Sequence, residues 1–136
     1  MYKTIIVPID LMHAERIQPM IQAARRLEGE GATLILTNVI EDVPSFMEAQ
    51  LPAGVIDRLK EQARLQLEEL AEGNAPGCEI EVRPGQPAAE ILELARERGA
   101  DLIVIASHQP GFGDFLIGST AARVVRHADC SVHVIR

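Results

Sequence analysis

The chain has 136 residues, 47% apolar and 24% charged, and its 20 acidic against 13 basic residues give a formal charge of −7. Residues 1–136 therefore fit a single domain that buries about 68% of its unfolded surface, and a disordered tail is excluded. With no basic face, one Tyr, three Phe and no Trp, the chain is not expected to bind nucleic acid or an anionic membrane.

Five apolar stretches alternate with helical patterns, which is typical of a parallel sheet covered by helices. The first, 4–9, is nearly continuous in β-branched residues, as in a central strand, with Pro8 at its end because proline cannot donate to a ladder. A helix follows, with Pro19 in its first turn, and Gly29 and Gly31 stop it. Its inward stripe is Ile17, Met20, Ile21, Ala24 and Leu27.

A second strand, 33–40, leads into an irregular segment, 41–53, that is the longest predicted loop. The next helix is closed by Gly73. A third strand, 78–83, is ended by residues 84–85; it alternates apolar with charged residues, so we expect it at an edge of the sheet. The inward stripe of the helix is Ile56, Leu59, Ala63, Leu67 and Leu70.

The third helix begins at Pro87 and is capped by Gly99 in the left-handed region. A second fully buried strand, 101–106, runs into the segment 107–120, and after a last helix the final strand is 131–136. This order predicts an α/β fold with an open, doubly wound parallel sheet and helices on both faces. The inward residues are Ala88, Ile91, Leu92 and Ala95 in the third helix and Ala121, Val124, Val125 and Ala128 in the last.

The cysteines and the lengths of the apolar runs indicate the cellular compartment of the protein. Cys78 and Cys130 form no CxxC or metal-ligand pattern, and no signal-peptide apolar region precedes Asp10. We therefore expect a reducing, cytoplasmic setting. Apolar runs such as 102–106 are far shorter than the ~20 residues that span a bilayer, so no membrane partner is predicted.

The residues that follow the two fully buried strands are the candidates for ligand binding, because ligands of open parallel sheets bind where the winding reverses. Asp10 can accept hydrogen bonds from a ribose or an amide. Gly118, Ser119 and Thr120 open a helix whose N–H groups and dipole favour an anion. Together they fit a nucleotide. Simple capping of the helix and simple termination of the strand are the alternative interpretations.

Other chemistries lack their motifs. The chain has no GxxxxGK[ST], no GxGxxG after the first strand and no Gly-x-Ser-x-Gly. The four histidines show no metal-ligand spacing, so no metal site and no catalytic residue is predicted. They are His13, His108, His127 and His133.

Residues 3–10, 85–92 and 101–136 resemble the universal stress protein family. The resemblance implies a Rossmann-like, five-stranded parallel sheet in the order 3-2-1-4-5 and a homodimer. We expect the dimer contact at the last strand, Ser131 to Arg136, where an unpaired ladder invites a second copy. A sheet edge protected by its charged terminus is the alternative.

Nucleotide-binding members of the family carry Gly, two residues, Gly, nine residues and Gly-Ser or Gly-Thr. Here Ala106 and Gln109 stand at the first two glycines, and only eight residues, 110–117, precede Gly118 and Ser119. By position, the resemblance implies base and ribose contacts, a phosphate border and phosphate donors. These are Pro8, Ile9, Asp10, Val39 and Ala106 for base and ribose, His108 and Gln109 for the border, and Gly118, Ser119 and Thr120 as donors.

The resemblance therefore implies a stress-response regulator that binds an adenine nucleotide, ATP or AMP, with Mg²⁺ entering through the phosphates. Binding is favoured over fast hydrolysis because the sequence offers no evident general base and no P-loop lysine. Two alternatives stay open. One is a dimeric interaction module with a degenerate nucleotide site, and the other is a slow ATPase in which His108 accepts a proton.

Overall fold

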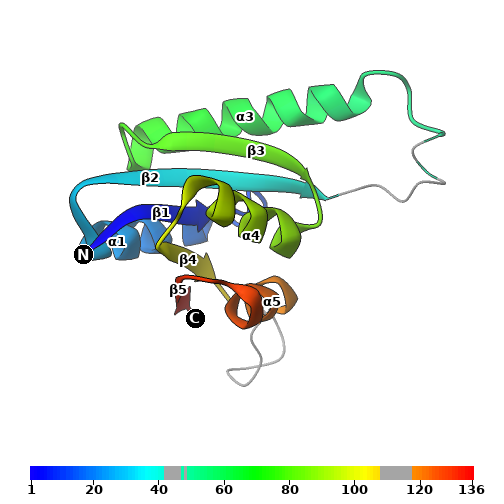
Figure 1. Ribbon diagram of the computed structural model, residues 1–136. Coiled ribbons are helices and arrows are strands. Elements are labelled where there is room, and N and C mark those ends of the chain that lie inside the picture. Colours follow the sequence, from blue (N-terminus) through cyan, green and yellow to red (C-terminus); the bar gives the residue numbers. More distant parts are fainter. Residues whose placement is uncertain (42–46, 48, 108–117) are drawn as a thin grey trace.

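The computed structural model describes residues 1–41, 47, 49–107 and 118–136. Within these ranges, five strands form one parallel sheet in the order β3-β2-β1-β4-β5 (Figure 1), so the predicted fold and strand order are confirmed. The strands are β1 Tyr2–Pro8, β2 Glu28–Glu41, β3 Glu79–Gly85, β4 Leu102–Ala106 and β5 Ser131–Ile135. The helices are α1 Ile17–Leu27, α3 Val55–Asn74, α4 Pro87–Arg98 and α5 Ser119–His127, and a 3-10 turn, η1 Ala14–Arg16, precedes α1.

Two apolar cores lie on opposite faces of the central strands. Successive residues of β1 face opposite sides, so Ile5 packs with residues of α1 and α3, whereas Ile6 packs with residues of α4 and α5. Leu102 and Ile103 of β4 divide in the same way. This two-sided burial is why β1 and β4 are nearly continuous apolar runs. None of the described helices is long and apolar enough to cross a bilayer.

The winding of the sheet reverses between β1 and β4, which are hydrogen-bonded neighbours. After β1 the chain passes through η1 into α1 on one face. After β4 it reaches α5, which lies with α4 on the other face. In Figure 1, α3 runs along β3 and β2, and α5 lies beside the β4–β5 side of the sheet. The carboxyl ends of β1 and β4 therefore diverge from each other.

The predicted start of the second strand was wrong. α1 ends at Leu27, before the two glycines that were expected to stop it, and β2 begins at once with Glu28 instead of residue 33, so Gly29 and Gly31 lie inside the strand. The pairing register between β1 and β2 shifts in this stretch, and Gly31 has a φ of +72°, which glycine adopts without strain. An irregular strand start of this kind has no periodicity that a sequence pattern could reveal.

Strand β3 occupies the predicted edge, but it continues through Pro84 and Gly85, where the sequence predicted its end. Proline is tolerated there because an edge strand has ladder groups that face away from its neighbour. α4 begins at Pro87 as predicted. Its cap, Gly99, has a φ of +61°, the left-handed conformation that was expected.

Two helices bury less than their stripes predicted. Leu59, near the start of α3, is 41% exposed. The buried residues of this helix are Ala63, Leu67 and Ala71, so its contact with the core begins after Leu59. α3 also continues past Gly73 to Asn74. Val125 of α5 is 47% exposed, whereas Ala121 and Val124 are buried. A nine-residue helix presents one narrow stripe to α4 and β5, and Val125 lies beyond its margin.

Candidate functional site

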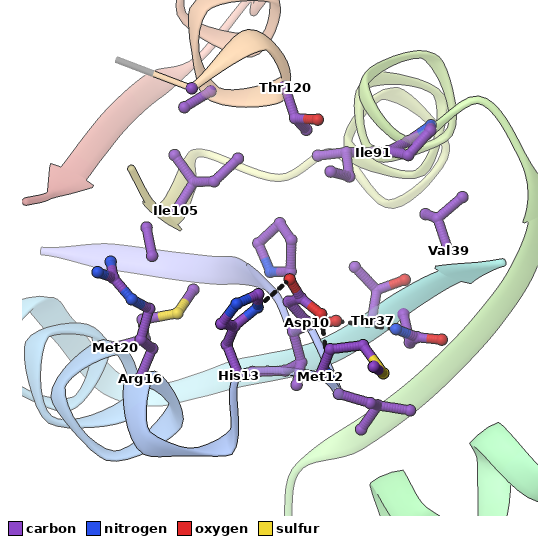
Figure 2. A pocket seen from close by; sticks show the side chains of 18 of the residues that line it. Asp10, Met12, His13, Arg16, Met20, Thr37, Val39, Ile91, Ile105 and Thr120 are labelled. Carbon is purple, nitrogen blue, oxygen red and sulfur yellow. Dashed lines mark hydrogen bonds and ion pairs between the residues drawn. The ribbon is translucent and has the colours of Figure 1, made fainter. Parts of the chain in front are cut away.

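A pocket of about 830 Å³ opens where the carboxyl ends of β1 and β4 diverge (Figure 2). Every predicted site residue within the described ranges lines it, whereas His108 and Gln109 lie outside those ranges. The fold thus gathers residues that are more than a hundred positions apart in the sequence. The predicted residues that line the pocket are Pro8, Ile9, Asp10, Val39, Ala106, Gly118, Ser119 and Thr120.

The floor of the pocket is fixed by hydrogen bonds that extend the sheet beyond β1. The Ile9 N–H donates to the Thr37 carbonyl at 2.7 Å, and the Asn38 side-chain amide donates to the Ile9 carbonyl at 2.9 Å. Pro8 has no N–H to offer, so the ladder resumes one residue later. Asp10 is therefore the first residue that leaves the sheet.

The Asp10 carboxylate is held in a local turn. Its Oδ1 accepts the Met12 N–H at 2.9 Å, and its Oδ2 lies 2.7 Å from Nδ1 of His13. The His13 N–H in turn donates to the Asp10 carbonyl at 3.0 Å. The Asp10 side chain is still 63% exposed, so it is oriented and open to the pocket at the same time. A carboxylate in this state can accept hydroxyl hydrogen bonds from a ligand.

Ser107, directly after β4, is hydrogen-bonded to three other elements. Its N–H donates to the Ile135 carbonyl at 2.8 Å, and its Oγ accepts the Gly118 N–H at 3.2 Å. Its carbonyl accepts from Nη1 of Arg16 at 3.2 Å. Ser107 is buried, so these bonds satisfy a polar residue directly after β4. They fix where α5 begins relative to β4 and β5.

The amino end of α5 supplies backbone donors to the pocket. Gly118 caps the helix with a φ of −57°, and its carbonyl accepts the Ala122 N–H at 2.8 Å. The amides of the first helical residues have no acceptor within a helix, and the dipole makes this end positive. Gly118, Ser119 and Thr120 all line the pocket. This end of α5 is thus suited to an anionic ligand group.

Sequence reasoning missed several lining residues, including His13, Arg16, Thr37 and Ile91. His13 and Arg16 lie in and beside a 3-10 turn too short for a periodic pattern, and their one signal is their place directly after a buried strand. Arg123, considered as a cation and left out of the predicted site, is exposed and does not line the pocket. In the part of the chain that the structure describes, no group of three or more His, Cys, Asp or Glu side chains could hold a metal ion.

An open parallel sheet whose winding reverses between β1 and β4, with a pocket at that switch point, defines a doubly wound α/β fold. The sequence model of the universal stress protein family matches residues 1–136. The chain therefore belongs to the universal stress protein family.

Similar proteins agree with this assignment over their full length. Universal stress protein G of Escherichia coli O157:H7 is 33% identical over 143 residues, with 100% of both chains covered. The structure of universal stress protein UspA from Lactobacillus plantarum matches with a TM-score of 0.69 and 27% identity, covering 99% of this chain and 98% of that one. The universal stress protein from Archaeoglobus fulgidus, solved in complex with dAMP, has the same fold with a TM-score of 0.59 and 22% identity, covering 99% and 98%.

Proposed function

We propose that this protein is a cytoplasmic regulator of the stress response that binds an adenine nucleotide, ATP or AMP. The observation that carries the proposal is the pocket between β1 and β4, which is lined by the Asp10 carboxylate, the apolar Val39 and the amino end of α5. These are the chemical groups that a nucleoside phosphate requires. The dAMP complex of the Archaeoglobus fulgidus family member supports the same ligand class.

Each part of the ligand has a complementary region in the pocket. Val39 and Ile91 offer apolar surface for the base, and Asp10 offers acceptors for ribose hydroxyls. The backbone N–H groups of Ser119 and Thr120, the first residues of α5, would hold phosphate oxygens. Mg²⁺ would be carried to this site on the phosphates of the nucleotide.

The proposed role is binding rather than rapid hydrolysis. Asp10 is tied to His13 and to the Met12 N–H, and it faces the region assigned to the ribose. The His108 of the slow-ATPase alternative lies outside the described residues. Phosphate release equal in the protein and in a His108→Ala variant would remove that alternative.

A calorimetric titration with ATP, AMP and GTP, with and without Mg²⁺, tests the proposed binding directly. We expect saturable binding of ATP and AMP and weaker binding of GTP. The reason is that the pocket residues stand at the positions for which the family resemblance implies contacts with an adenine nucleotide. A folded protein that binds none of the three would contradict the proposal and favour an interaction module with a degenerate site.

We also propose that the protein is a homodimer formed through β5. This strand is at an edge of the sheet, and Val132 and Val134 are only partly buried on it. An unpaired edge of this kind can continue its ladder into a second copy. Light scattering of a Val134→Asp variant should give the monomer mass, with thermal unfolding as the folding control. A persistent dimer would place the interface elsewhere.

A further inference from the structure

Arg16 places a permanent positive charge in the pocket. It is the last residue of η1, is partly buried and lines the pocket. Its Nη1 donates to the Ser107 carbonyl at 3.2 Å, across 91 positions of sequence. This bond fixes the guanidinium at the carboxyl end of β4, beside the residue that also holds the Gly118 N–H. Arg16 and the positive end of α5 therefore meet at Ser107.

The cation Arg16 lies at one side of the pocket, and the apolar residues Val39 and Ile91 lie at the other. Figure 2 shows Arg16 and Val39 on opposite sides of the pocket, with Asp10 between them. Ile91 lies on the side of Val39. A nucleotide whose base packs on Val39 and whose ribose meets Asp10 would therefore extend its phosphates toward Arg16.

The charges around the pocket are mainly negative, and Arg16 offsets them. The described lining residues include two acids, Asp10 and Glu41, and among them Arg16 is the side chain with a permanent positive charge. The whole chain carries a formal charge of −7. A phosphate group that enters beside Asp10 is repelled unless a nearby cation compensates.

We propose that Arg16 reads the phosphate charge of the ligand and sets a preference for ATP over AMP and for AMP over adenosine. This inference rests on the proposed function. A guanidinium has five N–H donors in a rigid fork and keeps its charge at every physiological pH. It can therefore bind a phosphate oxygen while another of its donors remains on the Ser107 carbonyl. Arg16 is a specificity-determining residue in this proposal.

The test compares three ligands that differ only in phosphate number. The dissociation constants of adenosine, AMP and ATP are measured by calorimetry in EDTA for the unsubstituted protein, R16Q, R16K and R123Q. Arg123 provides the matched control, because it is an exposed arginine of α5 that does not line the pocket. Adenosine binding is also the folding control, because a variant that binds adenosine as the unsubstituted protein does is folded.

We expect R16Q to weaken ATP binding by about 10- to 100-fold, the range for a lost hydrogen bond to a charged group. Its affinity for adenosine should stay as it was. R16K should be intermediate, because lysine keeps the charge and loses the fork. R123Q should resemble the unsubstituted protein.

Failure of this inference and failure of the proposed function give different results. An unsubstituted protein that binds no adenine ligand overturns both. If it binds ATP and R16Q keeps the same ratio of ATP to adenosine affinity, the inference on Arg16 is overturned and the proposed function stands. An equal loss of ATP and adenosine affinity in R16Q would make Arg16 structural and also overturn the inference, as would an R123Q effect as large as that of R16Q.

Discussion

The two ends of the β1–β4 pair use aspartate in opposite ways. At the amino end, Asp101 accepts hydrogen bonds from the backbone N–H groups of Lys3 and Thr4, at 2.9 to 3.1 Å, and ties β4 to β1. At the carboxyl end, Asp10 bonds only within its own turn in the contacts that have been described, and its side chain is 63% exposed. The Asp101 carboxylate thus holds two strands together, whereas the Asp10 carboxylate is exposed to the pocket.

The difference follows from what surrounds each residue. Asp101 lies where the two strands run side by side and backbone donors need acceptors. Asp10 lies where the strands have separated and the chain turns away into η1. Substitutions at the amino end should therefore change stability without changing binding, and substitutions at the carboxyl end should change binding first.

The largest effect is expected for Gly118→Leu. A bulky side chain at the cap of α5 would fill the space assigned to phosphate, and nucleotide affinity should fall by about 100-fold. The backbone of Gly118 has a φ of −57°, which other residues adopt, so the fold should persist. Calorimetry measures the affinity. Gly73→Leu is the control, because nothing lies within 4 Å of a Cβ at that exposed glycine. Unchanged ATP affinity in the Gly118 variant would refute the site.

Asp10→Ala should weaken adenosine binding by about tenfold, because the ribose loses a charged acceptor. Binding of free adenine should not change, since that ligand has no hydroxyls. Competition of each ligand against a fluorescent nucleotide gives both constants. The matched variant is Glu15→Ala, an exposed acid of the adjoining η1 that does not line the pocket. Equal losses for adenine and adenosine would count against a ribose contact.

Ser107→Ala should affect both binding and stability, because Ser107 stands between the pocket and β5. The variant leaves the Gly118 N–H without its acceptor at 3.2 Å, which should lower the free energy of unfolding by about 1 kcal/mol. Urea denaturation measures this change, and ATP affinity should also fall as α5 loses its anchor. Ser131→Ala, at an exposed serine of β5, serves as control. A Ser107 variant as stable as the parent protein would show that the bond contributes nothing.

Asp101→Asn tests the amino end and should have the smallest effect. One amide oxygen remains as an acceptor, so the free energy of unfolding at neutral pH should fall by about 0.5 kcal/mol, with nucleotide affinity unchanged. Burial raises the pKa of Asp101, but hydrogen bonds from the Lys3 and Thr4 N–H groups outweigh it and leave the pKa below its ordinary value.

The lowered pKa gives this prediction a pH dependence. The stability contributed by Asp101 is present above the ordinary carboxyl pKa of about 4 and is lost as the pH falls through the lower, folded value. The parent protein should therefore lose its advantage over Asp101→Asn in acid. Two outcomes would contradict the proposed difference between the two ends. One is a difference in the free energy of unfolding between the two proteins that stays the same at all pH values, and the other is reduced ATP binding by the variant.

Much of the fold was predictable because burial leaves a direct mark on sequence. The continuous runs of β1 and β4 indicate strands covered on both faces, and the alternating pattern of β3 indicates an edge. Gly99 and Pro87 marked a helix end and a helix start for stereochemical reasons. The start of β2 and the exposure of Val125 were predicted wrongly, since each depends on which neighbour the backbone meets in three dimensions.

The sequence by itself determined the class of the protein and the two stretches that form the pocket. Asp10 and Gly118 were predictable because strand ends and helix starts carry local signals. The tertiary structure alone decided that Arg16 reaches the Ser107 carbonyl and that Ser107 holds the start of α5. Those partners are separated by 91 and 11 positions. A contact between an irregular turn and a distant strand end depends on the geometry of the folded sheet, which no periodic pattern records.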